Sequence, residues 1–258
     1  MGHPALDLAS KTAIVIGGTS GIGLALALGL AEAGANVVPS SRHSGHVESA
    51  AAAIREKGRR SLAVSCDVSD RASLEALRDA ACAEFGAVDI LVNCAGITKR
   101  APVLEMSEED WNSILDTNLN GTLRSCQVFG RKMIERKLGR IINIASLSSF
   151  AAWNQVAAYG ASKSAVASLT KSLAIEWAAH GVCVNALVPG VFRTQLNSAL
   201  LDGTPRGKEI LMRTPMQRFG KVEELVGAAV FLASDAASFV TGHLLVVDGG
   251  YLASGVNQ

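Results

Sequence analysis

The sequence predicts a doubly wound α/β domain, with a parallel sheet of seven strands and helices on both faces. Apolar runs of strand length alternate with helix-length stretches along the 258 residues, a pattern that gives parallel strands joined by right-handed crossovers. No linker, charge run, internal repeat or low-complexity tract interrupts this alternation. With 49% hydrophobic and 18% charged residues, the chain can bury a large core and does not have the composition of a disordered protein. We therefore expect a single domain over residues 1–258.

Short apolar runs predict the strands. These are expected at 13–16, 36–38, 62–64, 88–92, 140–145, 182–188 and 244–247. Stretches of helix formers, most of them closed by a glycine, predict the helices. These are expected at 24–33, 47–57, 70–85, 108–137, 157–180 and 222–233. Ser69 or Asp70 is the expected N-cap of the third helix. Residues 191–218, with several prolines and glycines, are expected to form a lid-like insertion over a site.

The charge balance and the cysteines exclude several classes of protein. Lys and Arg total 24 and Asp and Glu total 23, so the net charge is +1, which argues against a nucleic-acid binder because such a protein needs a basic face. The five cysteines are scattered without a C-x-x-C pair, and no two histidines stand four apart, so no metal site is expected. Scattered, reduced thiols indicate a cytoplasmic protein.

Residues 12–31 carry no charge and are numerous enough to span a bilayer, but five of these twenty residues are glycines. A turn among the glycines would leave backbone groups unpaired in lipid, so no membrane span is expected. The segment instead predicts a strand, a turn and a helix, with the turn formed by Gly17-Gly18-Thr19-Ser20-Gly21-Ile22-Gly23. Glycines allow close approach of a phosphate, and a helix N-terminus offers free N–H groups, so this context favours a dinucleotide site.

The residues after the second predicted strand indicate which dinucleotide binds. An NAD site places an Asp or Glu about 20 residues past the glycine turn, where it binds the ribose 2′-OH. No carboxylate stands between Glu32 and Glu48, and Ser41 and Arg42 occupy the end of the strand instead. A guanidinium at this place pairs with a 2′-phosphate, so NADP(H) is the predicted cofactor.

Tyr159 and Lys163 stand four positions apart in a predicted helix and therefore share one face of it. A tyrosine has an ordinary pKa of about 10, and a cation about 4 Å away favours the phenolate by about 4 kcal/mol at an effective dielectric near 20. An isolated pair of this kind is more often a solvated surface pair. Ser146, thirteen positions upstream at the end of a predicted strand, favours catalysis because ligands bind at the carboxyl ends of strands in such sheets.

Together these motifs resemble the short-chain dehydrogenase/reductase family over residues 11–250. The glycine turn has that family's G-x-x-x-G-x-G spacing, and Tyr159 and Lys163 match its Y-x-x-x-K. Further matches are Asn93-Cys94-Ala95-Gly96, Thr117-Asn118-Leu119-Asn120-Gly121, Pro189-Gly190 with Thr194 four positions on, and Val247-Asp248-Gly249-Gly250. Cys94 stands where the family has a second asparagine, and Ile16 where it usually has a threonine. The resemblance implies a Rossmann-type fold.

The resemblance also implies roles for individual residues. Tyr159 is the implied general acid/base, Ser146 orients the substrate oxygen, and Lys163 lowers the pKa of Tyr159 and binds the nicotinamide ribose. Asn118 positions a water that links Lys163 to solvent. Besides Ser41 and Arg42, the residues implied to contact the cofactor are Gly17, Thr19, Ser20, Gly21, Ile22, Gly23, Asp67, Val68, Asn93, Ala95, Gly96, Tyr159, Lys163, Pro189, Gly190, Val191 and Thr194. Asp67 and Val68 flank the adenine in this scheme.

The implied activity is the NADP(H)-dependent interconversion of a secondary alcohol and a ketone. Lys99 and Arg100 follow the fourth-strand motif as a basic pair does in the gluconate and deoxygluconate dehydrogenases of this family, so Arg100 is the candidate for binding a substrate carboxylate and a keto-sugar acid is the expected substrate. Solvated loop charges are an equally open interpretation of this pair. A 3-oxoacyl-thioester reductase and a nicotinamide-binding sensor without catalysis remain alternatives. Enoyl reductases usually have a wider Tyr-to-Lys gap, and sugar-nucleotide epimerases a longer chain.

The two long helices expected at 108–137 and 157–180 need cover on their outer faces. The second is rich in alanine, serine and glycine, small residues that let helices approach closely. Related proteins often pair these helices across a two-fold axis and use the last strand and helix for a second interface. A homotetramer is therefore the expected assembly.

Overall fold

Six parallel strands form one sheet in the computed structural model, which describes residues 3–194 and 198–255. The strands are β1 (Thr12–Ile16), β2 (Asn36–Ser40), β3 (Ile90–Asn93), β4 (Gly139–Ile144), β5 (Val182–Pro189) and β6 (Leu244–Val247). Their order in the sheet is β2-β1-β3-β4-β5-β6. The chain runs outward from β1 to β2 and then returns to β3 on the other side of β1, so the topological switch point lies between β1 and β3.

The seventh strand expected at 62–64 does not form, so the sheet has six strands rather than seven among the described residues. The segment runs beside β2, and Val37 N–H donates to the Arg60 carbonyl at 3.2 Å. The next residue of β2 on the same edge is Pro39, which has no N–H to continue the ladder. The Ser40 hydroxyl donates to the Val64 carbonyl at 2.6 Å, but backbone-to-backbone hydrogen bonding resumes only at Cys66. The proline therefore explains why this prediction was wrong.

All six predicted helices are present, with shifted ends and two additional helices. The α-helices are α1 (Gly21–Glu32), α2 (Ser44–Glu56), α3 (Arg71–Phe85), α4 (Glu108–Leu115), α5 (Gly121–Arg136), α6 (Ala157–Trp177), α7 (Ser198–Leu201), α8 (Pro205–Arg213) and α9 (Val226–Ala233). Short 3₁₀ helices are η1 (Pro4–Leu6), η2 (Val103–Glu105), η4 (Leu147–Ser149), η5 (Ala178–His180), η6 (Val222–Leu225) and η7 (Asp235–Ala237). Asp70 is the N-cap of α3, since its side chain accepts from Ala72 N–H at 2.9 Å. Within the described ranges, no helix has the length and apolarity to cross a membrane.

The helix predicted over 108–137 is interrupted by a π-helical turn, η3 (Asp116–Asn120). The Gly121 N–H donates to the Asp116 carbonyl five residues back, instead of four as in an α-helix. The Thr122 hydroxyl donates to the Asn118 carbonyl at 2.8 Å. Single π turns inside helices are often found at functional sites, and this one carries Asn118.

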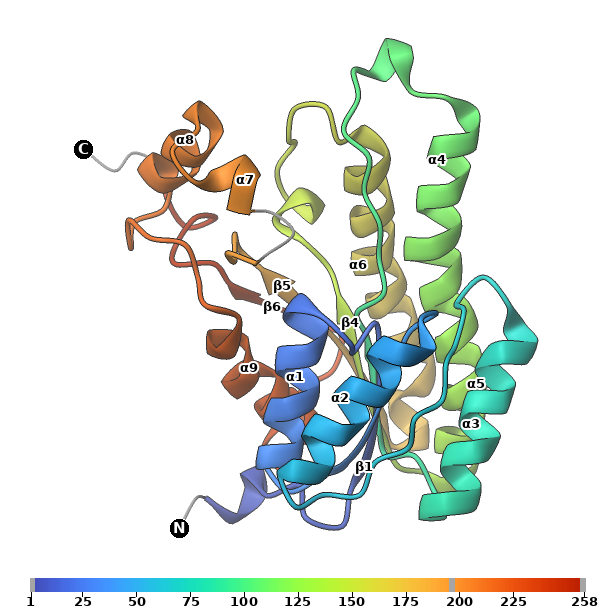
Figure 1. The fold of residues 1–258 in the computed structure, drawn as a ribbon. Helices are drawn as coiled ribbons and strands as arrows, with labels where there is room; N and C mark the ends of the chain where they lie inside the picture. Colours follow the sequence, from blue (N-terminus) through green and yellow to red (C-terminus); the bar gives the residue numbers. More distant parts are fainter. Residues whose placement is uncertain (1–2, 195–197, 256–258) are drawn as a thin grey trace.

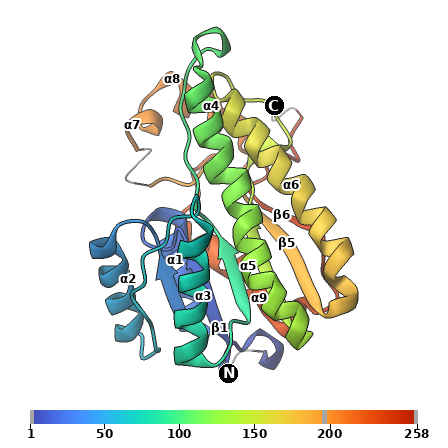
Figure 2. The ribbon, with the colours of Figure 1, turned by 90° about the vertical axis from the view of Figure 1, so that its right-hand side faces the viewer.

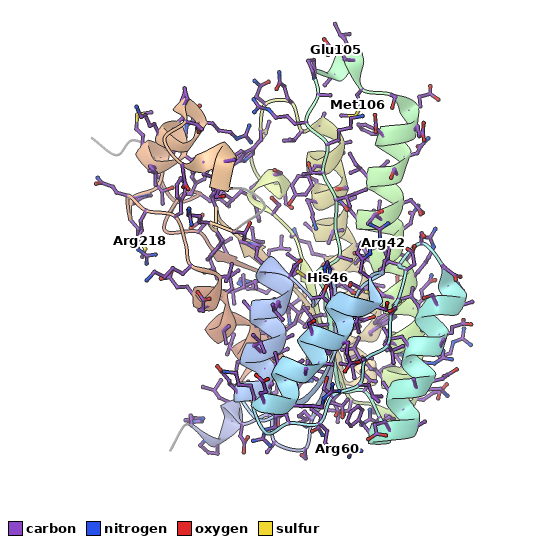
Figure 3. The ribbon with its side chains drawn as sticks, viewed as in Figure 1. Arg42, His46, Arg60, Glu105, Met106 and Arg218 are labelled. Carbon is purple, nitrogen blue, oxygen red and sulfur yellow. The ribbon has the colours of Figure 1, made fainter. Side chains whose placement is uncertain are left out.

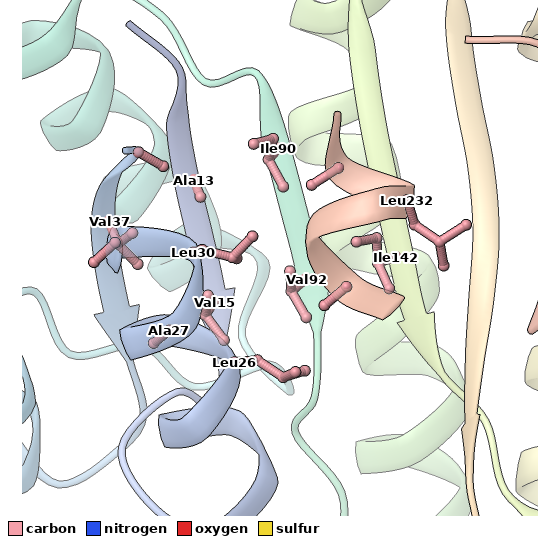
Figure 4. Packing of buried hydrophobic residues seen from close by; sticks show 14 of the residues in the cluster. Ala13, Val15, Leu26, Ala27, Leu30, Val37, Ile90, Val92, Ile142 and Leu232 are labelled. Carbon is pink, nitrogen blue, oxygen red and sulfur yellow. The ribbon is translucent and has the colours of Figure 1, made fainter. Parts of the chain in front are cut away.

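Helices cover both faces of the sheet, as Figures 1 and 2 show. On one face α1 and α9 pack over strand residues such as Ala13, Val15 and Val92 (Figure 4). On the other face α3, α5 and α6 pack over Ile14 and Ile16. Every residue of β1 is buried, as expected for a parallel strand covered on both sides.

The carboxyl ends of the strands lie toward one end of the molecule. Figure 1 shows α7 and α8, together with the chain that follows β3 into η2, at that same end. Residues 191–218, expected as an insertion, contain α7 and α8, while 195–197 of that stretch lie outside the described residues. Phe192 makes an isolated parallel bridge with Gly220 and is buried, which fixes the two ends of the insertion to each other.

Candidate active site

The glycine turn after β1 packs tightly against the chain after β3. Gly17 has φ +79°, and a Cβ there would lie 2.6 Å from Ala95 N. A Cβ on Gly23 would lie 2.0 Å from the Gly17 carbonyl oxygen. Ser20 is the N-cap of α1, and its side chain makes no capping hydrogen bond. The turn therefore leaves an open helix N-terminus beside a close-packed backbone, which fits a pyrophosphate.

The predicted 2′-phosphate residues lie next to this turn. Thr19 Oγ1 donates to Ser41 Oγ at 3.0 Å, which joins the turn to the end of β2. Arg42 is exposed, and Figure 3 shows its side chain near His46, at the start of α2. The structure thus brings two hydroxyls together beside the turn, and Arg42 follows Ser41 directly in the chain. These are the donors that a phosphate monoester requires.

Asp67 and Val68 have structural partners of their own. Asp67 Oδ1 accepts from Ser69 N–H at 2.9 Å and from the Ser69 hydroxyl at 2.7 Å. These bonds, aided by the charge of Arg42, hold the pKa of the Asp67 carboxyl below its ordinary value. Val68 is buried and packs against the backbone of Gly121. Both side chains therefore have partners within the protein, and their place beside the adenine stays a prediction.

Asn93 ends β3 with its side chain turned into the core. Its Nδ2 donates to Asn143 Oδ1 at 2.9 Å, and its Oδ1 accepts from the Ser125 hydroxyl at 2.6 Å. Asn143 Nδ2 in turn donates to Thr170 Oγ1 at 3.0 Å. This buried network ties β3 to β4, α5 and α6. The amide of Asn93 is therefore occupied within the protein, which leaves only its backbone for the predicted contact with the cofactor.

Ser146, Tyr159 and Lys163 come together at the end of β4. Ser146 lies two residues after the end of β4 and is the N-cap of η4, with its hydroxyl accepting from Ser148 N–H at 3.1 Å. Tyr159 and Lys163 project from the first turns of α6, and Lys163 Nζ lies 5.8 Å from the centre of the Tyr159 ring. Lys163 is 5% exposed, and its Nζ donates to the Ile144 carbonyl at 2.7 Å. The predicted catalytic trio is thus assembled beside the carboxyl end of the sheet.

Burial of Tyr159 and Lys163 shifts the pKa values of both groups. Burial raises the pKa of Tyr159 above its ordinary value, although hydrogen bonding with Ser146 opposes this rise. Burial also lowers the pKa of Lys163 to about 8. That Lys163 lowers the pKa of Tyr159 stays a prediction for the cofactor-bound protein.

Asn118, on the π turn, is fully buried and links the loop after β3 to α6. Its Oδ1 accepts from Ile97 N–H at 2.8 Å and its Nδ2 donates to the Ile97 carbonyl at 2.9 Å. The same Nδ2 lies 3.0 Å from Ser162 Oγ. A Cβ built on Gly96 would lie 3.3 Å from Asn118 Oδ1 and 3.6 Å from Lys163 Nζ. The asparagine therefore fixes the loop that borders Lys163, a contact that the sequence did not predict.

The remaining predicted residues surround this trio. Pro189 ends β5, and Gly190 packs so closely that a Cβ there would lie 2.6 Å from Asp248 Cα. Val191 packs against residues beside Ser146, and a Cβ on Gly21 would lie 3.8 Å from Thr194 Cγ2. The insertion thus starts at the site and passes the glycine turn. Ile22 lies in the first turn of α1. Its side chain packs into the core, so only its backbone is left to contact a cofactor.

Arg100 is exposed on the loop after β3. Its Nε donates to Gln155 Oε1 at 2.8 Å, and Ala101 N–H donates to the Gln155 carbonyl at 3.0 Å. These bonds hold Arg100 against the loop that precedes α6 and Tyr159. Lys99, its neighbour, instead forms an ion pair with Asp110 at 2.5 Å. The structure therefore separates the basic pair and joins Arg100 to the loop that leads into α6.

Comparisons with known proteins agree with this arrangement. A family model described as "Enoyl-(Acyl carrier protein) reductase" matches residues 17–252. Gluconate 5-dehydrogenase of Gluconobacter oxydans is 42% identical over 258 residues, covering 98% of this chain and 100% of that protein. D-threitol dehydrogenase of Mycolicibacterium smegmatis is 43% identical over 244 residues, covering 95% and 94%. A solved gluconate 5-dehydrogenase from Burkholderia cenocepacia, in complex with NADP and tartrate, has a TM-score of 0.93 at 42% identity over 97% of this chain and 98% of that one.

These matches extend from the glycine turn to the chain after β6 and include every segment that contributes to the site. The turn at the switch point and the Ser146, Tyr159 and Lys163 trio lie inside residues 17–252, which the family model matches. The chain belongs to the short-chain dehydrogenase/reductase family.

Proposed function

We propose that the protein is an NADP(H)-dependent oxidoreductase that interconverts a secondary alcohol and a ketone. The observation that carries this proposal is the trio Ser146, Tyr159 and Lys163 at the end of β4, on the same edge of the sheet as the glycine turn after β1. A nicotinamide held by this edge supplies the hydride chemistry. The protein's own residues then have to bind the substrate oxygen and move one proton.

Tyr159 holds that proton in the proposed reaction. Because burial raises its pKa, Tyr159 is protonated at neutral pH and can donate to the oxygen of a ketone. Ser146 lies within hydrogen-bonding range of Tyr159 and orients the same oxygen. Lys163, held by the Ile144 carbonyl, faces the nicotinamide ribose. Asn118 fixes the loop beside Lys163, and we retain for it the role of ordering a water that leads from Lys163 to solvent.

The choice of NADP(H) over NAD(H) rests on the end of β2. Thr19, Ser41 and Arg42 offer donors there, and no carboxylate stands between Glu32 and Glu48 to bind a ribose 2′-OH. The Burkholderia cenocepacia relative, at 42% identity, is described in complex with NADP. These two observations support the same cofactor independently.

A keto-sugar acid is the proposed substrate. Arg100 is joined by Gln155 to the loop that leads into α6, and its guanidinium suits a carboxylate. The Gluconobacter oxydans relative is a gluconate dehydrogenase, and the Burkholderia cenocepacia relative is described with tartrate, a hydroxy acid. D-Threitol, the substrate in the name of a third relative, has no carboxylate. The charge of the substrate is therefore the property to test.

NADPH oxidation by the purified protein tests the proposal across 5-keto-D-gluconate, 2-keto-3-deoxygluconate, D-erythrulose, an acetoacetyl thioester and 2,3-butanedione. We expect the highest kcat/KM with a keto-sugar acid, and Arg100→Ala should lower that value while leaving thioester reduction unchanged. Reduction of the thioester with no activity on any sugar acid would establish the 3-oxoacyl-thioester reductase alternative instead. NADPH binding without turnover of any of these compounds would indicate a sensor.

The proposed assembly is a homotetramer, and the proposed location is the cytoplasm. Ile175 on α6 and Phe239 before β6 are almost fully exposed, on the two surfaces that the sequence predicted to pair. The five cysteines are all free, which suits a reducing compartment. A monomer in light scattering at micromolar concentration would contradict the assembly.

A further inference from the structure

A guanidinium of the insertion stacks on an aromatic ring next to the catalytic trio. Arg206, in the first turn of α8, has its guanidinium carbon 5.4 Å from the centre of the Trp153 ring. Trp153 in turn stacks on Tyr251, with ring centres 5.7 Å apart and planes 24° apart. Three segments meet in this stack: α8, the loop before α6, and the chain after β6. Figure 1 shows α8 beside that loop, at the end of the molecule where the strands end.

The stack borders Ser146. Trp153 and Tyr251 pack on a small buried cluster that contains Ala145 and Leu147, the two residues that flank Ser146 in sequence. Two residues after Trp153, Gln155 holds Arg100. The Trp153 loop therefore connects Ser146, Arg100 and Arg206, three side chains that are more than 40 residues apart from one another in the chain.

Neither guanidinium has a counter-ion in the described part of the chain. Arg100 bonds a neutral amide, and no ion pair of Arg206 is found there, while Glu209 on α8 pairs with Arg213 at 3.3 Å. Partial burial and the positive charge of Arg100 both lower the pKa of Arg206, and the carboxylate of Glu209 opposes them only in part. A partly buried guanidinium that also feels a like charge is stabilised by an anion placed beside it.

Trp153 offers a further unused donor. Its indole Nε1 is buried and has no hydrogen-bond acceptor among the described residues. Buried N–H groups nearly always have a partner, so an unpartnered one beside a catalytic serine is a place for a ligand atom. It is an observation independent of the two arginines.

We propose that Arg206 binds the anionic end of the substrate together with Arg100, so that α8 of the insertion determines the specificity for acids. This inference rests on the proposed function, because it names a second residue that would select acids as substrates of the proposed reaction. A carboxylate placed between the two guanidinium groups removes their mutual repulsion and accepts charge-assisted hydrogen bonds. A neutral ketone leaves that repulsion as it is in the free protein and gains nothing from the two arginines, so the pair discriminates by attracting acids. The Trp153 N–H is then free to donate to a hydroxyl or to the carboxylate of the bound acid.

The test compares Arg206→Ala with Lys208→Ala, which removes the same charge from an exposed position two residues along α8. KM for 5-keto-D-gluconate should rise about 10- to 100-fold in Arg206→Ala, the scale of charge-assisted hydrogen bonds. The value of kcat/KM for 2,3-butanedione, which carries no charge, should stay unchanged. Arg206→Lys, which keeps the charge and loses the planar fork, should give an intermediate KM. Lys208→Ala should behave as the unsubstituted protein.

A binding measurement separates this inference from the proposed function. D-Gluconate titrated calorimetrically into the NADPH-loaded protein cannot react, and Arg206→Ala should weaken its binding by the same factor. Trp153→Phe, which keeps the ring and removes the N–H, should weaken it to a smaller extent. Unchanged gluconate affinity and unchanged KM in Arg206→Ala would overturn the role of Arg206 while leaving the sugar-acid activity intact. An unsubstituted protein that neither binds gluconate nor reduces any sugar acid would overturn both.

Discussion

Replacing Lys163 by methionine should stabilise the cofactor-free protein at neutral pH. The amine is buried, and among the described residues its hydrogen bond is to the Ile144 carbonyl. Burial lowers its pKa from the ordinary 10.5 to about 8, so at pH 7 the folded protein holds a charge in a place that disfavours it. Methionine has a similar length and no charge. The active-site lysine is thus expected to cost stability that the cofactor would restore on binding.

The sign and size of the effect follow from the two pKa values. Between pH 8 and 10.5 the unfolded chain binds the Lys163 proton and the folded chain does not, so the stability of the unsubstituted protein rises with pH through that window. At pH 7 the full penalty is present, about 3 kcal/mol at about 1.4 kcal/mol per pH unit. Loss of the hydrogen bond to Ile144 subtracts about 1 kcal/mol from the gain in Lys163→Met, and this part does not depend on pH.

Urea unfolding followed by circular dichroism, at pH 7 and pH 9.5 and at one protein concentration, measures the difference. The stability advantage of Lys163→Met should fall by about 2 kcal/mol between these two pH values. Lys171→Met, on an exposed face of the same helix, is the control and should show no such change. If the stability advantage of Lys163→Met changes by less than about 0.5 kcal/mol between the two pH values, Lys163 titrates normally in the fold and the reasoning is refuted.

Three further outcomes are expected. Arg42→Ala should raise KM for NADPH about 10-fold and leave KM for NADH unchanged; a protein that already prefers NADH would contradict the cofactor assignment. Tyr159→Phe should lower kcat by about 10²- to 10⁴-fold with cofactor affinity retained, and near-full kcat would refute its role as acid. Asn143→Leu should lower the free energy of unfolding by about 2–3 kcal/mol, because Asn93 Nδ2 loses its 2.9 Å acceptor inside the core; a loss below about 0.5 kcal/mol would show that the buried network relaxes or admits water.

Strand and helix positions could be predicted because apolar runs and glycine stops act locally. The exceptions depend on neighbours in space. A run such as 62–64 looks like a strand by itself, but whether it forms one depends on Pro39 in the strand beside it. Nothing in the sequence of Asp116–Asn120 marks a π turn, because its cause is tertiary: the Asn118 amide bonds both backbone groups of Ile97.

The site was predictable in position and less so in electrostatics. The Tyr159 and Lys163 spacing correctly predicted that both side chains meet beside Ser146, since helix geometry fixes residues four apart. Their pKa values depend on burial, which a pattern of residue types does not measure. Arg206 and Trp153 were not predicted at all, because their contact joins segments about fifty positions apart and has no periodic or motif signal.

The π turn also bears on how this chain can change over evolutionary time. A π turn takes up about one residue more than an α-helical turn while completing the same rotation. Deleting one residue from Asp116–Asn120 would therefore restore a regular helix and leave α4 and α5 facing the same way, with Ile114, which is 2% exposed, still in the core. The deletion would instead displace the Asn118 amide, which bonds both backbone groups of Ile97. The length of this turn is thus tied to the position of Asn118 rather than to the packing of α4.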